Sequence, residues 1–330
     1  MVSGQKITRK PANAAQPSGV RIIKPMKVYH SLHEYQPHAG GACVALGFFD
    51  GVHRGHRAVI GACAKDSGTL PCLVLTFAES PLKALGKPSP PLLSRNPLKA
   101  RLLEEAGADE VIFADFNAIK ALSPTEFVRS VLHDRLNAKS VYCGFNYRFG
   151  KDGAGDTDAL RRLCEPYGIS VRVSEPVCCG GEQASSSLIR ERIMSGEIAR
   201  ANELLGYRYA VRGEITGGNQ VGSVIGFPTV NLPMDTGLVT PCRGVYASRI
   251  RIDGISYRGA TNIGVHPTVG AQEEPLCETF LLDFEGGDLY GKQAVCELIA
   301  FVRPERRFGS VEALTAQIER DCETIRGISD

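Results

Sequence analysis

The sequence Gly47-Phe48-Phe49-Asp50-Gly51-Val52-His53-Arg54-Gly55-His56 is the most informative part of the first half of the chain. The preceding residues, 42–46, form a short apolar run that is typical of a buried parallel strand. The following residues, 57–64, favour a helix. The glycines of the stretch allow the backbone to turn sharply and to approach a ligand closely. A strand, a glycine-rich turn and a helix in this order predict a ligand site at the start of the helix.

Two histidines within this stretch indicate the chemistry of that ligand. His53 and His56 fall where the helix begins, and free backbone N–H groups with the positive end of the helix dipole favour an anion there. Transfer of a phosphoryl or nucleotidyl group needs hydrogen-bond donors aimed at charge that develops in the transition state. We therefore expect a phosphate site. The alternative is a pair of ordinary loop histidines, which is the more common explanation of an isolated His-x-x-His.

Strands and helices alternate along the chain from Cys43 to about Gly206. The apolar patterns predict strands over 71–77, 110–114, 140–143 and 170–177, and helices over 97–106 and 157–164. A further helix is expected from Ser123-Pro124-Thr125-Glu126, which has the residues of a capping box with Pro in the first turn. This alternation predicts a parallel sheet with helices on both faces. Ligands bind such sheets at the carboxyl ends of the strands, where the loop 144–150 would join Gly47–His56.

Ser185-Ser186-Ser187-Leu188-Ile189-Arg190 predicts another helix start near the end of this half. Hydroxyl groups at a helix start, with Arg190 one turn further on, can bind phosphate oxygens. The alternative is an N-cap serine followed by a surface arginine, and the motif alone does not separate the two.

After Gly206 the pattern changes to short β-type runs with glycine-rich turns. We expect strands over 211–216, 244–252, 255–260, 278–284 and 295–302. Strands at this spacing without helices between them predict an antiparallel barrel, and Asp253-Gly254 predicts a type I′ hairpin within it. The closing helix has an apolar stripe that is spaced to cover the barrel. The stripe consists of Val311, Leu314, Ile318, Cys322 and Ile325.

The length of 330 residues is enough for two domains, and we expect the boundary near Gly206. A formal net charge of +2 gives no reason to expect a nucleic-acid partner. No apolar run approaches the roughly 20 residues of a membrane helix, so no membrane partner is expected. The 11 cysteines include no C-x-x-C pair, which predicts neither a zinc site nor a disulfide framework. A reducing cytoplasm is the expected location.

Residues 1–25 have a composition of their own. They contain five basic residues and no acidic one, with prolines and little periodicity. We expect a disordered basic arm over 1–25. A solvated tail is the simpler interpretation, and binding of an anionic partner is the alternative.

Gly47–His56 resembles the HxGH-type nucleotidyltransferase signature, in the form carried by prokaryotic bifunctional riboflavin kinase/FMN adenylyltransferases (FAD synthetases). Residues 144–150 with Gly155-Asp156 are similar to a second loop of that family, and 185–190 are similar to its Ser-Ser-Thr-x-Ile-Arg motif. In the second half, Gly226-Phe227-Pro228-Thr229-Val230-Asn231 resembles the riboflavin kinase signature. Further segments that follow the family's order are 244–247, 262–264, 267–268, 290–292 and 303–305.

The resemblance covers about Met26 to Arg326. It implies a Rossmann-like nucleotidyltransferase domain over 26–206 and a riboflavin kinase domain, an antiparallel β-barrel with a terminal helix, over 207–330. It also implies two reactions in sequence. ATP first phosphorylates riboflavin to FMN, and a second ATP then transfers its adenylyl group to FMN, which gives FAD and pyrophosphate. The implied partners are riboflavin, FMN and ATP, with Mg²⁺ as the metal.

In the first half, the resemblance implies that His53 and His56 are catalytic residues. The residues that it implies for ATP binding are Gly47, Phe49, Asp50, Gly51, His53, Gly55, His56, Ser186, Ser187 and Arg190. Asn146 and Arg148 are the residues that it implies for FMN binding.

In the second half, the resemblance implies that Glu278 is the base that takes the proton from the terminal ribityl hydroxyl of riboflavin. Thr229 and Asn231 would bind Mg²⁺, which prefers small oxygen ligands. The residues implied for nucleotide or flavin binding are Gly226, Pro228, Thr229, Asn231 and Arg303. Taken singly, Thr229, Asn231 and Glu278 are better explained as two turn residues and a solvated carboxylate. The family resemblance favours the catalytic roles.

Two positions depart from the family pattern. Ser80 stands where relatives commonly have a His, in Phe77-Ala78-Glu79-Ser80-Pro81. Phe280 also stands in place of a common His, and an apolar residue suits a barrel strand. The change at Ser80 leaves open an enzyme that keeps only the kinase activity. A second alternative is a flavin- or nucleotide-binding regulator without turnover, which would not need a general base such as Glu278.

Overall fold

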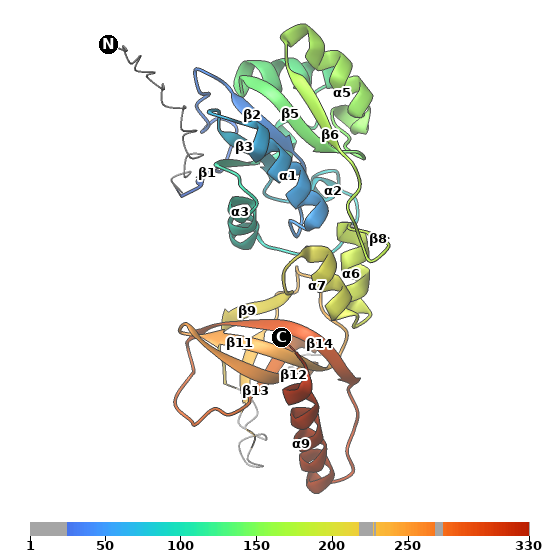
Figure 1. Ribbon diagram of the computed structural model, residues 1–330. Coiled ribbons are helices and arrows are strands. Elements are labelled where there is room, and N and C mark those ends of the chain that lie inside the picture. The colour runs from blue at the N-terminus through green and yellow to red at the C-terminus, as the bar shows by residue number, and fades with distance from the viewer. Residues whose placement is uncertain (1–24, 218–226, 228, 268–272, 330) are drawn as a thin grey trace, which may run out of the picture.

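The computed structural model describes residues 25–217, 227, 229–267 and 273–329. It has a parallel sheet with helices at one end, a β-barrel at the other end, and the helices α6 and α7 between them (Figure 1). This arrangement confirms the predicted fold class, an α/β half followed by an antiparallel barrel with a terminal helix. The disordered arm expected over 1–25 lies outside the described residues, apart from Pro25.

The first half contains a six-stranded sheet in the order β1-β4-β3-β2-β5-β6, in which every pair of neighbours is parallel. Its strands are β1 (Lys27–Tyr29), β2 (Ala42–Leu46), β3 (Cys72–Phe77), β4 (Glu110–Ala114), β5 (Ala138–Gly144) and β6 (Ser170–Ser174). All but β1 were predicted. The edge strand β1 gives no apolar pattern to detect, because it has three residues and Val28 is exposed.

Helices cover both faces of this sheet, because successive side chains of a strand point to opposite faces. In β2, Val44 and Leu46 belong to one hydrophobic core, whereas Cys43 and Ala45 belong to the other. The helices and turns of this half are α1 (Arg54–Asp66), α2 (Pro81–Ala84), α3 (Asn96–Glu105), η1 (Phe116–Ala118), α4 (Pro124–Glu126), η2 (Phe127–Arg135), η3 (Lys151–Gly153), α5 (Thr157–Cys164) and η4 (Glu165–Tyr167).

The helix predicted from Ser123 is present with its capping box. The Ser123 hydroxyl accepts the N–H of Glu126, and the Glu126 carboxylate accepts the N–H of Ser123. Beyond Glu126 the segment η2 winds as a π-helix, in which the N–H of Leu136 reaches the carbonyl of Val131 five residues back. The apolar residues of η2 still fill the core on one face of the sheet.

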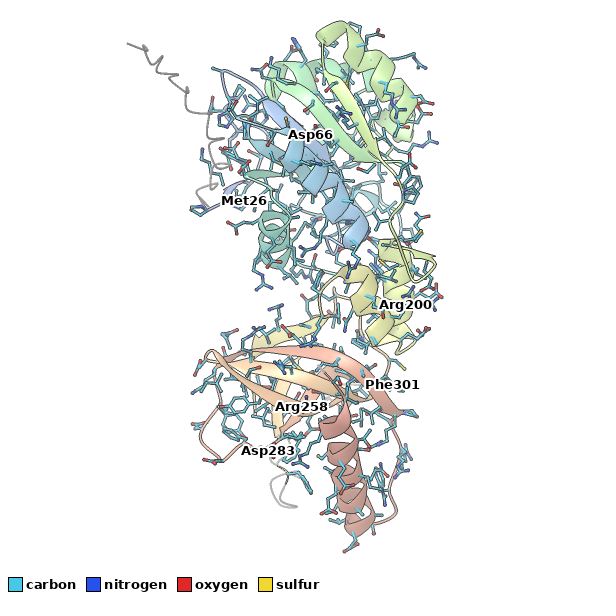
Figure 2. The ribbon with its side chains drawn as sticks, in the orientation of Figure 1. Met26, Asp66, Arg200, Arg258, Asp283 and Phe301 are labelled. Carbon is cyan, nitrogen blue, oxygen red and sulfur yellow. The ribbon has the colours of Figure 1, made fainter. Side chains whose placement is uncertain are left out.

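A hairpin and two helices follow the sheet: β7 (Cys178–Cys179), β8 (Glu182–Gln183), α6 (Ser186–Met194) and α7 (Ile198–Leu205). Ser185 caps α6 as expected, since its hydroxyl accepts the N–H of Leu188. The apolar faces of α6 and α7 share one hydrophobic core with the inside of the barrel. Figure 2 shows Arg200 of α7 in the region between the sheet and the barrel. Gly206, with a φ of 80°, ends α7 in the left-handed conformation.

The second half is an antiparallel barrel in the strand order β10-β13-β12-β11-β14-β9. Its strands are β9 (Ala210–Glu214), β10 (Thr229–Pro233), β11 (Gly244–Ile252), β12 (Ile255–Pro267), β13 (Glu273–Leu281) and β14 (Gln293–Pro304). A bridge between Thr216 and Asn231 brings the two edges of the sheet together and nearly closes the barrel. Asp253 and Gly254 have φ values of 48° and 81°, as the predicted type I′ hairpin requires.

Helix α9 (Val311–Gly327) closes the chain and lies against the barrel (Figure 1). The later part of its predicted apolar stripe, from Ile318 to Ile325, packs on Val245 and Ala247 of β11. The first residue of the stripe, Val311, is exposed. Across the described residues, none of the helices combines the length and the apolar character needed to span a membrane.

Candidate active sites

The turn between β2 and α1 has a strained backbone. Phe49 and Val52 are buried, and their φ values of 52° and 38° are positive. A β-branched residue such as Val rarely adopts this conformation, and such strain persists only where surrounding contacts enforce it. Strained backbone of this kind clusters at functional sites.

His53 and His56 stack on each other at the start of α1. Their ring centroids lie 3.6 Å apart with an interplanar angle of 22°. His53 is the N-cap residue, and its Nδ1 accepts the backbone N–H of His56 at 3.4 Å. An imidazole that accepts at Nδ1 carries its proton on Nε2 when it is neutral. The His53 ring therefore has an N–H donor at Nε2.

Both imidazoles are neutral near pH 7. Burial, with a smaller effect of the Arg190 guanidinium, lowers the pKa of His53 to about 4. Burial also lowers the pKa of His56 well below its usual value, and His53 and Lys99 add to that shift. The pair therefore supplies hydrogen-bond donors rather than full positive charges before a ligand binds.

The low pKa of His53 makes the stability of the fold sensitive to acid. The unfolded chain takes up a proton at this side chain below about pH 6.5, whereas the folded chain takes it up only near pH 4. Stability is thus fully present above pH 6.5 and falls as the pH drops toward 4, by about 2 kcal/mol at pH 5. Urea unfolding at pH 7 and pH 5 measures this loss. We expect His53→Gln to reduce it, and His33→Gln, at an exposed histidine, to leave it unchanged.

A cavity of about 830 Å³ opens beside this histidine pair. The predicted residues that line it are Gly47, Phe49, His53, Gly55, His56, Asn146, Arg148, Ser186 and Ser187. The structure thus brings together three segments that are separate in the sequence: the β2–α1 turn, the loop after β5 and the start of α6. Arg148 is well exposed, and its Nη1 lies 3.8 Å from the carboxylate of Asp156.

Three of the predicted ATP-binding residues, Asp50, Gly51 and Arg190, do not line this cavity. Arg190 donates to the carboxylate of Asp50 and to the carbonyl of Pro91, and both charged side chains are buried. Burial raises the pKa of Asp50, and the Arg190 guanidinium opposes that shift. Gly51 donates its N–H to the hydroxyl of Ser94. In this structure the Asp50–Arg190 pair joins the β2–α1 turn to α6.

A second cavity, of about 660 Å³, lies in the second half between the barrel and α9. Thr229, Glu278 and Arg303 line it, as does Phe280. The Thr229 hydroxyl donates to Oε1 of Glu278 at 2.7 Å. This hydrogen bond leaves the oxygen lone pairs of Thr229 free for a cation.

Asn231 lies directly opposite Glu278 in the β10–β13 ladder. Its side chain is buried, and its Oδ1 finds no hydrogen-bond partner among the described residues. A buried amide oxygen without a partner is costly, and a water molecule or a cation would satisfy it. Gly226 and Pro228 of the same motif lie outside the described residues.

Arg303 is held in place by protein groups. Its Nε and Nη2 donate to the buried carboxylate of Asp321 at 2.7–3.0 Å, and its Nη1 donates to the carbonyl of Pro304. The guanidinium therefore joins β14 to α9 at the wall of the cavity.

Comparison with known proteins agrees with this two-site arrangement. Residues 35–188 match the family described as FAD synthetase, and residues 205–329 match the family described as riboflavin kinase. The chain is 35% identical over 309 residues to the bifunctional riboflavin kinase/FMN adenylyltransferase of Escherichia coli (strain K12), covering 91% of this chain and 97% of that protein. The chain belongs to the bifunctional riboflavin kinase/FMN adenylyltransferase family.

Other relatives extend this result. The bifunctional riboflavin kinase/FMN adenylyltransferase of Bacillus subtilis (strain 168) is 33% identical over 307 residues, covering 91% of this chain and 96% of that protein. A crystal structure described as a macrolide-efflux protein from Streptococcus pneumoniae has the same fold, with a TM-score of 0.83, 29% identity and coverage of 93% of this chain and 100% of that one. The chain is a bifunctional enzyme that uses ATP to convert riboflavin to FMN and FMN to FAD.

One side chain near the FAD synthetase cavity was not predicted from the sequence. Lys99 of α3 is buried, and its ammonium donates to the carbonyls of Phe48 and Phe77. Phe48 lies two residues after β2, and Phe77 is the last residue of β3. Burial lowers the pKa of Lys99 to about 8, and the Asp50 carboxylate opposes that shift. The sequence does contain a signal, because Lys99 shares the apolar face of α3 with Leu102 and Leu103.

Sequence reasoning also missed one contact at the riboflavin kinase cavity. The Asn262 amide donates to the Glu305 carboxylate at 3.2 Å, and both side chains line the cavity. Both residues stand in segments that resemble the family, which was the available signal. Ser80, at the position where relatives commonly have a His, is buried at the start of α2 and its side chain makes no capping hydrogen bond.

Proposed function

We propose that the cavity beside His53 and His56 is the site of adenylyl transfer, and that the barrel cavity with Thr229 and Glu278 is the site of riboflavin phosphorylation. The observation that carries this assignment is that His53, His56, Ser186 and Ser187 line the first cavity, whereas Thr229 and Glu278 line the second. The first cavity has neutral hydrogen-bond donors at a helix start. The second has a carboxylate beside a hydroxyl, and the buried amide of Asn231 lies opposite that carboxylate in the β10–β13 ladder.

In the adenylyl-transfer site, a phosphate oxygen of FMN attacks the α-phosphorus of ATP, and the bond to the departing pyrophosphate breaks. The attacking oxygen is already ionised, so the step requires no general base. Charge develops on the phosphate oxygens, and the Nε2–H of His53 with the N-terminal N–H groups of α1 stabilises it. Arg148, an exposed residue of the cavity lining, is the group proposed to bind the FMN phosphate.

In the riboflavin kinase site, the terminal ribityl hydroxyl attacks the γ-phosphorus of ATP and ADP leaves. Glu278 takes the proton of that hydroxyl, which is the role of a general base. Its hydrogen bond from Thr229 fixes the orientation of the carboxylate. The hydrogen bond from Thr229 engages Oε1, and Oε2 is the oxygen proposed to face the substrate.

Mg²⁺ fits the residues of this site. Asn231 offers a buried amide oxygen without a partner among the described residues, and Thr229 offers hydroxyl lone pairs two residues away on the same strand. These are hard oxygen ligands of the kind Mg²⁺ binds beside substrate phosphates. When bound, the metal ion neutralises charge on the ATP phosphates and holds them in position.

We further propose that the boundary between the two catalytic domains lies near Gly206, with residues 26–206 and 207–330 on either side. The left-handed Gly206 at the end of α7 and the change from helices to barrel strands support this division. A cytoplasmic location is supported by the 11 cysteines, all of which are free thiols. Residues 1–25 are proposed to form a basic arm.

The proposed function is tested by incubating the protein with riboflavin, ATP and Mg²⁺ and separating the flavins by chromatography. We expect FMN to appear first and FAD to follow, with ADP and pyrophosphate as co-products. Accumulation of FMN without FAD would contradict an active adenylyl-transfer site and would favour a kinase-only enzyme with Ser80 as the impairing change. Absence of both products would favour a regulator.

A further inference from the structure

The segment 92–95 between α2 and α3 holds Asp50 from behind the adenylyl-transfer site. The backbone N–H of Leu93 donates to the Asp50 carboxylate at 3.0 Å, and that of Ser94 donates to it at 3.3 Å. The Ser94 hydroxyl in turn accepts the N–H of Gly51 at 3.2 Å. These bonds join segment 92–95 directly to the turn that carries His53.

The same segment is bound on its other side by residues 235–239 of the barrel half. The N–H of Leu92 donates to the carbonyl of Gly237, and the N–H of Val239 donates to the carbonyl of Leu92, each at 2.9 Å. The Arg95 guanidinium forms a two-pronged ion pair with the carboxylate of Asp235. Gly237 packs so closely on this guanidinium that an added Cβ would overlap it.

Residues 235–239 are themselves firmly placed. Asp235 follows the end of β10 by two residues, and β10 carries Thr229 and Asn231 of the kinase site. The hydroxyl of Tyr209, a buried residue of the barrel core, donates to the carbonyl of Val239 at 2.6 Å. Leu93 is also buried in that core.

We propose that residues 235–239 of the barrel half position the adenylyl-transfer site, acting through segment 92–95 on Asp50. Each step of the path is a hydrogen bond or an ion pair between named groups. This inference rests on the proposed assignment of the adenylyl-transfer site. It makes Arg95, Asp235 and Gly237 positioning residues, since none of them lines either cavity.

The direction of the effect follows from where the path ends. Asp50 bonds to Arg190 of α6 and to the backbone of segment 92–95, and its own carbonyl accepts the Ser186 hydroxyl at 3.0 Å. Loosening segment 92–95 therefore shifts the turn that orients the Nε2–H donor of His53. Such donors act mainly in the transition state, so kcat for adenylyl transfer should fall while the KM for ATP changes little.

The test compares full-length variants in separate assays of FMN adenylylation and riboflavin phosphorylation. Arg95→Met removes the ion pair from the sheet side, and Gly237→Ala displaces the guanidinium while keeping both charges. We expect each to lower kcat for adenylylation about fivefold, the effect of losing an exposed ion pair of up to about 1 kcal/mol. Riboflavin phosphorylation should be unchanged. The matched control is Arg161→Met, which removes an ion pair with Asp158 on α5.

A double-mutant cycle separates positioning from simple destabilisation. We expect Arg95→Met combined with Asp235→Asn to be no slower than either single variant, because both remove the same contact. Unchanged adenylylation in Arg95→Met, equal losses of both activities, additive losses in the cycle, or an equal loss in Arg161→Met would each overturn the proposal. His53→Ala tests the site assignment separately, so failure of one can be told from failure of the other.

Discussion

Replacing His53 with Ala is expected to lower the rate of FAD formation from FMN and ATP by about a hundredfold or more, while riboflavin phosphorylation continues. The imidazole lies at the start of α1 with its Nδ1 held by the backbone N–H of His56. Its Nε2–H is therefore a fixed donor beside the cavity. Removing one such donor costs transition-state stabilisation that water in the vacated space cannot restore with the same geometry.

The measurement is the steady-state rate of each reaction with its own substrate supplied. His33→Ala, at an exposed histidine of the same half, is the matched control. His56→Ala should have a similar effect to His53→Ala, and the double variant should lose less than the product of the two, because the stacked rings act together. Loss of riboflavin phosphorylation in a folded His53→Ala variant would contradict the two-site assignment.

Much of the proposed adenylyl-transfer site could be predicted from the sequence because its residues lie in contiguous motifs. Gly47–His56 and Ser185–Arg190 each combine a helix start with side chains that suit phosphate, and local patterns determine where helices start. The role of Arg190 could not be predicted in this way. Its partner Asp50 is 140 residues away along the chain, and no local pattern indicates such a pair.

The same limit applies to the division of the chain. The change of pattern at Gly206 predicts where the alternation of strands and helices ends. Each strand predicted on either side of it has a counterpart in the structure, whereas β1 and β10 were not predicted. The spacing of the apolar residues in α6 and α7 does not indicate which part of the protein they pack against. The structure shows that they share the core of the barrel. Periodicity predicts that a face is buried, but the surface that buries it depends on tertiary contacts.

In the barrel, sequence reasoning predicted five of the six strands of the sheet. It missed β10, which carries Thr229 and Asn231, and it did not predict the pairing that brings the proposed kinase residues together. Asn231 and Glu278 are opposite each other only because β10 and β13 pair in this register. A shift by one residue would turn the two side chains to opposite faces. The family resemblance identified Asn231 and Glu278 as candidate residues, and the strand register places them next to each other.

Replacing Glu278 with Gln is expected to lower FMN formation from riboflavin by at least about a hundredfold. Gln has nearly the same volume as Glu. Its amide oxygen can still accept the hydrogen bond from the Thr229 hydroxyl, which donates to Glu278 at 2.7 Å. The substitution therefore removes the base and leaves the local structure largely in place. The loss should appear in kcat, since riboflavin and ATP still bind.

The matched control is Glu285→Gln, which neutralises an exposed carboxylate shortly after β13 in the same half. FAD formation from supplied FMN should be unaffected in both variants, because Glu278 does not line the adenylyl-transfer cavity. With riboflavin as the only flavin, Glu278→Gln should accumulate neither FMN nor FAD, whereas His53→Ala should accumulate FMN. These opposite patterns follow from two separate cavities in one chain. A Glu278→Gln variant that phosphorylates riboflavin at the normal rate would show that another group removes the ribityl proton.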